Sequence, residues 1–106
     1  YFGLSIETLI ADEASGRLTK DAVIRQVKSI SDKSKLDILC ALKESPMYNL
    51  KLSEHLGLSP STVSHHTNTL LSCGFVTVEK KDGKVYYCLH RDNISRFISS
   101  LEQMLL

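Results

Sequence analysis

Residues 52–74 read LSEHLGLSPSTVSHHTNTLLSCG, and the order of apolar, turn and capping residues here is the strongest indication of the fold. Leu52 and Leu56 are four residues apart, which places both on one face of a short helix expected at about residues 50–56. Gly57 follows, and glycine readily adopts the left-handed conformation at which many helices end. The first half of the stretch therefore predicts a helix that stops at a sharp turn.

A second helix is expected over residues 60–73. Ser59 is a favourable N-cap, and Pro60 suits the first helical position because proline lacks only an N–H that would be unpaired there. The side that anchors this helix is apolar: Val63, Leu70 and Leu71. The other side carries polar side chains and almost no charge: Ser61, Thr62, Ser64, His65, Asn68, Thr69 and Ser72. Together the two helices and their turn predict a helix-turn-helix unit.

Three further amphipathic helices are expected upstream of this unit. The first has apolar residues at helical spacing: Phe2, Ile6, Leu9 and Ile10. The second is capped by Thr19, and its predicted core face holds Val23, Ile24, Val27 and Ile30. The third is capped by Asp32 or Ser31, and its predicted core face holds Leu36, Leu39, Cys40 and Leu42.

Residues 76–89 change to the alternating pattern of a β-hairpin. Asp82 and Gly83 suit a two-residue turn. This turn pairs two apolar couples: Val78 with Tyr87, and Val76 with Leu89. One face of the hairpin is then continuously apolar, and we expect that face to pack on the helices. Tyr86 lies on the other face, either near the tip or as a cover for the sheet.

A closing amphipathic helix is expected within residues 92–106, with apolar residues at Ile94, Phe97, Ile98, Leu101, Met104 and Leu105. The whole pattern predicts a mainly α fold with a small β-hairpin (α+β), a winged helix-turn-helix. We expect this unit at residues 31–91, with the helices in residues 1–30 before it and the closing helix at residues 92–106 after it. The closing helix shows more apolar surface than a small domain needs.

Composition limits what such a chain can do. With 106 residues, 42% hydrophobic and 24% charged, it can build one ordinary globular core. No apolar run approaches the roughly 20 residues of a membrane span. The formal net charge is +1, so any contact with nucleic acid must depend on the local placement of charge. Three widely spaced cysteines inside apolar patterns favour buried thiols and a reducing, intracellular setting.

The polar face of the helix at 60–73 can enter the major groove of DNA, because its short side chains permit close approach. The candidate DNA-binding residues on this face are Ser61, Thr62, Ser64, His65 and Asn68. The hairpin tip adds Lys80, Lys81 and Lys84, which could contact phosphates as a wing. The alternatives are that these lysines only solubilise the tip, and that the fold is a winged-helix module that binds proteins and not DNA.

Four short blocks in this order closely resemble the ArsR-type (arsenic-repressor-like) winged-helix regulators of bacteria. They are DKSKLDIL at 32–39, LSEHLGLS at 52–59, STVSHH at 61–66 and GKVYY at 83–87. The resemblance implies a transcriptional regulator, expected to be a repressor that binds double-stranded DNA at an inverted repeat. It also implies that Ser61, Ser64 and His65 lie at recognition positions, whereas Pro60 stands where a polar residue is common in the family.

The same resemblance implies that the unit at residues 31–91 binds DNA and that the protein is a homodimer in which the first and last helices pack together. The helices in residues 1–30 would serve dimerisation or a link to an upstream region, and the closing helix at residues 92–106 would serve dimerisation. The expected dimerisation residues are Phe2, Ile6, Phe97, Leu101 and Leu105. Metal-sensing members carry a cysteine pair before the recognition helix, but residues 47–52 contain no cysteine. We therefore expect no metal site and no cofactor, and the effector stays unidentified.

Other chemistry finds little support in the sequence. His65 and His66 are adjacent on a helix and point about 100° apart, so they cannot easily share one metal ion. We expect His65 to face DNA and His66 to be partly buried. Ser64 and His65 lack a third catalytic member, so no enzyme is expected.

Overall fold

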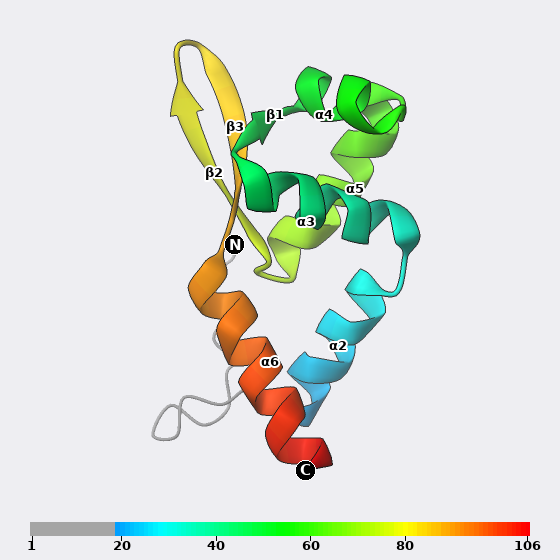
Figure 1. Ribbon diagram of the computed structural model, residues 1–106, viewed down its shortest axis with the longest axis vertical. Helices are drawn as coiled ribbons and strands as arrows, with labels where there is room; N and C mark the ends of the chain where they lie inside the picture. The colour runs from blue at the N-terminus through cyan, green and yellow to red at the C-terminus, as the bar shows by residue number, and fades with distance from the viewer. Residues whose placement is uncertain (1–18) are drawn as a thin grey trace.

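The computed structural model describes residues 19–106. The predicted first helix, with Phe2 and Ile6, lies outside the described residues. The elements in chain order are α2 (Lys20–Ile30), α3 (Lys33–Glu44), β1 (Met47–Tyr48), α4 (Asn49–Leu56), α5 (Pro60–Ser72), β2 (Val76–Lys81), β3 (Lys84–Leu89) and α6 (Arg91–Leu105). Figure 1 shows α3, α4 and α5 clustered beside the hairpin β2–β3, with α2 and α6 extending away from this cluster. The predicted winged helix-turn-helix is confirmed.

Capping side chains begin the helices where the sequence predicts them. The bonds are Ala22 N to Thr19 Oγ1 (3.0 Å), Ser34 N to Asp32 Oδ1 (2.7 Å) and Thr62 N to Ser59 Oγ (3.2 Å). Gly57 has a φ of 69°, which is the left-handed stop between α4 and α5. A cap that the sequence did not reveal begins α6, where Asn93 N donates to His90 Nδ1 at 3.0 Å.

Within the described residues the strands form one antiparallel sheet in the order β1-β3-β2. The predicted register is confirmed, with Val76 opposite Leu89 and Val78 opposite Tyr87. The turn residues Asp82 and Gly83 have φ values of 53° and 75°, as a primed hairpin turn requires. The additional strand β1 was not predicted, because two residues are too few to show an alternating pattern.

The prediction that one hairpin face packs continuously on the helices is wrong. Val76, at the base of the hairpin, is 2% exposed, whereas Val78 is 49% exposed and Val85 is 41% exposed. The hairpin projects past the helical cluster (Figure 1), so only its base has helices to pack on.

The core lies where α3, α4 and α5 meet the base of the hairpin. Its most buried apolar side chains are Ile38, Leu52, Val63, Leu70 and Phe75. The burial of Val63 and Leu70 confirms the predicted anchoring side of α5, while Leu71 is half-buried. The predicted inward face of α3 is partly wrong, because Leu36 and Cys40 are exposed while Ile38 and Ala41 are buried.

The predicted core face of α2 is also partly wrong. Ile24 and Val27 are exposed, while Ala22, Val23 and Gln26 are buried. The buried Gln26 donates from its Nε2 to the carbonyl of Cys73 at 3.1 Å, while its Oε1 is buried with no hydrogen-bond partner among the described residues. This bond ties α2 to the end of α5, and it leaves an apolar stripe of α2 outside.

Phe97 of α6 was predicted at a dimer interface, but it lies in the core of the subunit. Its side chain is 5% exposed. The Phe97 and Phe75 rings meet edge to face, with centroids 5.3 Å apart and planes at 81°. Phe97 therefore holds α6 against the helix-turn-helix, and its side chain leaves little exposed surface on the subunit.

Candidate nucleic-acid interface

The polar face of α5 points away from the core. Ser61, His65 and Asn68 are exposed, and Thr62 and Ser64 are half-buried. Ser61, His65 and Asn68 follow one another at spacings of four and three residues, so they form one continuous stripe on the helix. This stripe is free of formal charge apart from the imidazole, and it can approach a surface that offers both hydrogen-bond donors and acceptors.

The N-terminus of α5 carries a network of hydroxyl groups. Ser59 Oγ donates to Thr62 Oγ1 at 2.8 Å and lies 3.2 Å from Ser61 Oγ. Ser59 Oγ also accepts the Thr62 backbone N–H. Thr62 therefore contributes to the cap of α5, and Ser61 is the more exposed of the two candidate contacts.

Asn49 is a residue of this region that the sequence pattern did not single out. It is the first residue of α4, and its Nδ2 donates to Pro60 O at 3.1 Å and to Ser64 Oγ at 2.8 Å. The two helices are thus tied together directly beside a candidate DNA contact. The only signal in the sequence is an amide residue next to a short apolar segment, and this pattern is too common in proteins to predict a contact.

The three lysines of the wing are exposed at the hairpin tip: Lys80, Lys81 and Lys84. The Nζ atom of Lys84 lies 4.3 Å from the centre of the Tyr48 ring, in a cation–π contact. Tyr48 meets the Tyr86 ring edge to face, with centroids 5.4 Å apart. β1 therefore provides an aromatic support for one lysine of the wing, and Tyr86 belongs to that support.

His66 is half-buried, as predicted, and its Nδ1 is buried with no hydrogen-bond partner among the described residues.

The three cysteines differ in their exposure. Cys40 is exposed, which contradicts its predicted place in the core, while Cys73 and Cys88 are half-buried. Burial, and to a smaller extent the charge of Glu79, raises the pKa of the Cys88 thiol. Cys88 is therefore kept in its less reactive, protonated form.

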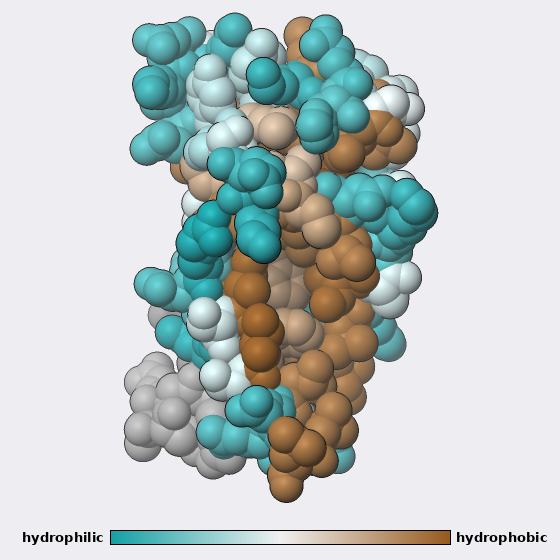
Figure 2. Space-filling view, viewed as in Figure 1, coloured by the Kyte–Doolittle hydropathy of each residue, from teal (hydrophilic) through white to brown (hydrophobic). Residues whose placement is uncertain are grey.

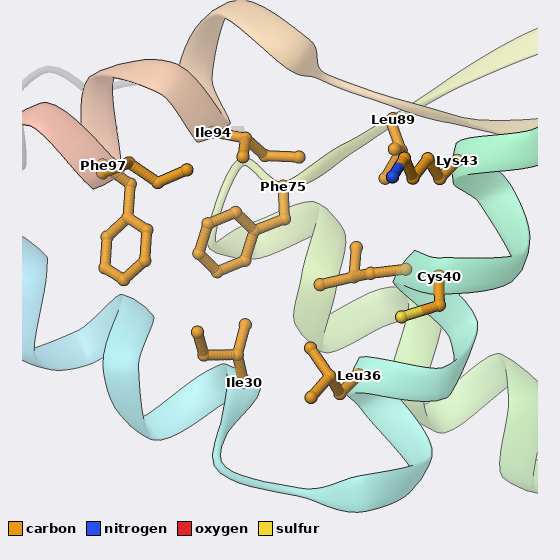
Figure 3. A pocket seen from close by; sticks show the side chains of 10 residues that line it. Ile30, Leu36, Cys40, Lys43, Phe75, Leu89, Ile94 and Phe97 are labelled. Atoms are coloured by element: carbon orange, nitrogen blue, oxygen red, sulfur yellow. The ribbon is translucent and has the colours of Figure 1, made fainter.

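Apolar side chains gather on the half of the molecule formed by α2 and α6 (Figure 2). The exposed members on these helices are Ile24, Val27, Ile98, Met104 and Leu105. Next to them an apolar pocket of about 280 Å³ opens between α3, α6 and the end of α2. Figure 3 shows Leu36 and Cys40 on one side of this pocket and the Phe75 and Phe97 rings on another.

The side chains of residues 19–106 do not form a metal centre. No group of three or more His, Cys, Asp or Glu side chains in this part of the chain could hold a metal ion. The helices described here are too short or too polar to cross a membrane.

Known proteins are similar to this chain in sequence and in fold. The family model that describes the bacterial regulatory proteins of the ArsR family matches the sequence at residues 32–78. The HTH-type transcriptional regulator CmtR of Mycobacterium tuberculosis is 32% identical over 89 residues, which cover 84% of this chain and 75% of CmtR. The arsenical resistance operon repressor of Staphylococcus aureus is 33% identical over 75 residues, which cover 71% of this chain and 72% of that repressor.

A solved structure gives the same result for the fold. It is the homodimeric winged helix-turn-helix DNA-binding domain of a possible ArsR-family regulator from Mycobacterium bovis, at a TM-score of 0.67 and 21% identity. The match covers 80% of this chain and 79% of that domain. These similarities give no support to the alternative of a protein-binding module. This chain belongs to the ArsR family of bacterial regulatory proteins, which are transcriptional regulators with a winged helix-turn-helix DNA-binding domain.

Proposed function

We propose that this protein is a homodimeric repressor that reads an inverted repeat in double-stranded DNA. In each subunit α5 enters the major groove, and five residues face the bases: Ser61, Thr62, Ser64, His65 and Asn68. The observation that carries this proposal is the two-sided character of α5. Val63 and Leu70 are fully buried and hold the helix in place, while its opposite face is polar and outward.

The wing supplies the second part of the DNA contact. Lys80, Lys81 and Lys84 lie on the exposed hairpin tip, which projects from the same end of the molecule as α4 and α5 (Figure 1). Lysines that neutralise phosphates release counterions, which favours binding at low salt without reading the sequence. The wing would thus add affinity, while α5 would add specificity.

The dimer would form through α2 and α6. Both helices expose apolar side chains that a single subunit leaves in contact with water, and Leu105 is 73% exposed while Leu101 is half-buried. The Mycobacterium bovis neighbour is homodimeric. A two-fold dimer presents two copies of α5, so its DNA site would have matching two-fold symmetry.

In this proposal residues 31–91 bind DNA and the closing helix at residues 92–106 serves dimerisation, while residues 1–30 serve dimerisation or a link to an upstream region. A repressor of this type would act where bacterial DNA is, in the cytoplasm.

The proposal is tested by selecting bound fragments from genomic DNA and measuring their affinity by fluorescence anisotropy. Ser64→Ala and His65→Ala should each weaken binding to the selected site by about 1 to 3 kcal/mol, because each removes a base contact. The matched control is Ser72→Ala, at the far end of α5, which should leave the affinity unchanged. If the wild-type protein enriches no sequence, or if both variants bind like wild type, α5 is not the reading helix.

A further inference from the structure

Asn49 lies at the junction between the two helices of the helix-turn-helix. Its side-chain amide donates two hydrogen bonds into the first two turns of α5, to Pro60 O at 3.1 Å and to Ser64 Oγ at 2.8 Å. The pair Asn49 and Ser64 is separated by 15 residues in sequence, so the tie exists only because the turn folds α4 back over α5.

The direction of these bonds is fixed by chemistry. A backbone carbonyl can only accept a hydrogen bond, so the end of the Asn49 amide that faces Pro60 must be the NH₂ group. The same NH₂ group faces Ser64 Oγ. The Ser64 oxygen is therefore the acceptor in its bond with Asn49, and its hydroxyl hydrogen is not used there.

The Ser64 hydroxyl hydrogen also lacks its usual acceptor within the helix. A helical serine commonly donates to the carbonyl four residues back, which is Pro60 O for Ser64. Pro60 O already receives the Asn49 NH₂ group, and in a regular helix it also receives the backbone N–H of Ser64. A carbonyl has two lone pairs, so both are taken. Within residues 19–106, Ser64 Oγ donates no hydrogen bond.

We propose that Asn49 is a positioning residue that sets the polarity of Ser64 and thereby the base that Ser64 reads. With its oxygen held by Asn49, the Ser64 hydroxyl presents a donor to the major groove. Bases that offer an acceptor there are favoured: guanine through O6 and N7, adenine through N7, and thymine through O4. Cytosine, which offers the N4 donor, leaves the Ser64 hydrogen unpaired and is disfavoured. This inference rests on the proposed insertion of α5 into the major groove.

The experiment uses four versions of the selected DNA site that differ at one base pair. This base pair is first located by comparing the DNA selected by wild type with the DNA selected by Ser64→Ala, and it is the position at which the two selections differ. For the wild-type protein we expect an acceptor base to be preferred over cytosine by about fivefold, the value of one neutral hydrogen bond. Asn49→Ala should reduce this preference to about twofold or less, while the affinity for unrelated DNA stays the same.

Three further variants separate positioning from folding. The double variant of Asn49→Ala with Ser64→Ala should show the same preference as Ser64→Ala alone, because the two residues act as one unit. Asn49→Asp keeps the size of the side chain but can only accept, so it should also remove the preference. The control is Ser53→Ala, which removes another helix-turn-helix bond, from Ser53 Oγ to Leu58 O. It should lower the melting temperature and leave the base preference unchanged.

The outcomes distinguish this inference from the proposed function. If the wild-type protein selects no sequence, the proposed function fails first. If it selects a site and Ser64→Ala alters one base pair, but folded Asn49→Ala and Asn49→Asp keep the wild-type preference, DNA reading stands and the role of Asn49 is refuted. If Ser64→Ala changes no base pair, Ser64 makes no base contact and the inference about Asn49 falls with it.

Discussion

At the scale of single residues, Gly74 joins α5 to the hairpin at a position where a side chain has no room. Its φ is 82°, and an added Cβ would overlap the Nδ2 atom of Asn93. That same Nδ2 donates to Gly74 O at 2.7 Å, which ties the start of α6 to the end of α5. Gly74→Ala should therefore lose both the relaxed backbone and this hydrogen bond. We expect a loss of about 2 to 3 kcal/mol in the free energy of unfolding, measured by urea denaturation.

Gly57 is the matched control for this prediction. It has a similar φ of 69°, but a Cβ there would meet no atom within 4 Å. Gly57→Ala should cost only the backbone strain, about 1 kcal/mol. Equal losses at the two glycines would show that Asn93 makes way for the methyl group at no cost.

At the scale of elements, the start of α3 depends on an ionised side chain. Asp32 accepts the backbone N–H of Ser34 at 2.7 Å, and Lys35 Nζ lies 3.7 Å from its other oxygen. The hydrogen bond from Ser34 is the largest cause that lowers the pKa of Asp32, since it favours the charged carboxylate. α3 in turn carries Ile38 and Leu42 into the core.

The lowered pKa of Asp32 determines how the stability of the fold changes with pH. A carboxyl group with a lower pKa in the folded state stabilises the fold above its unfolded pKa of about 3.9, and this contribution is lost as the pH falls through the folded value. Asp32→Ala should therefore be less stable than wild type at pH 7, and the difference should shrink below about pH 4. Thermal melting across this pH range measures the effect.

Asp32→Asn serves as the control for titration. It keeps an oxygen that can cap α3, but it carries no charge that changes with pH. The stability of this variant should depend less on pH than that of wild type in the acid range. If the difference in stability between wild type and Asp32→Ala stays the same from pH 7 to below about pH 4, the charge of Asp32 does not stabilise the start of α3.

At the scale of the whole molecule, the subunit has two ends of different character. One end carries α4, α5 and the wing, with polar and basic surfaces, and the other exposes the apolar side chains of α2 and α6 (Figures 1 and 2). Such a division suits a dimer whose joined ends are apolar and whose free ends meet DNA. The apolar end therefore tests the proposed assembly.

Placing a charge on the apolar end should separate the subunits. For Ile24→Asp combined with Leu105→Asp we expect the mass seen by sedimentation equilibrium to fall to that of one chain. The affinity for an inverted repeat should then fall at least about tenfold, because two linked half-sites bind more tightly than one. Val85→Asp, at an exposed apolar position of the wing, should keep the dimeric mass. A single-chain mass for wild type would refute the proposed dimer.

Much of the fold follows from local chemistry that a sequence displays directly. Ser59, Pro60 and Gly57 define the turn and the start of α5 through their own conformations and caps, and Asp82 with Gly83 sets the hairpin register. The polar face of α5 follows from helical spacing alone. These features need no partner from elsewhere in the chain, so they can be predicted from local sequence.

Other features depended on contacts between distant residues. α2 and α3 carry more apolar residues than one small core can bury, so spacing could not tell that Leu36 and Ile24 lie outside while Ile38 lies inside. Phe97 meets Phe75, β1 pairs with β3, and Asn49 reaches Ser64 only after the chain has folded. All elements compete for a limited interior, so which side chains are buried depends on how the whole chain packs.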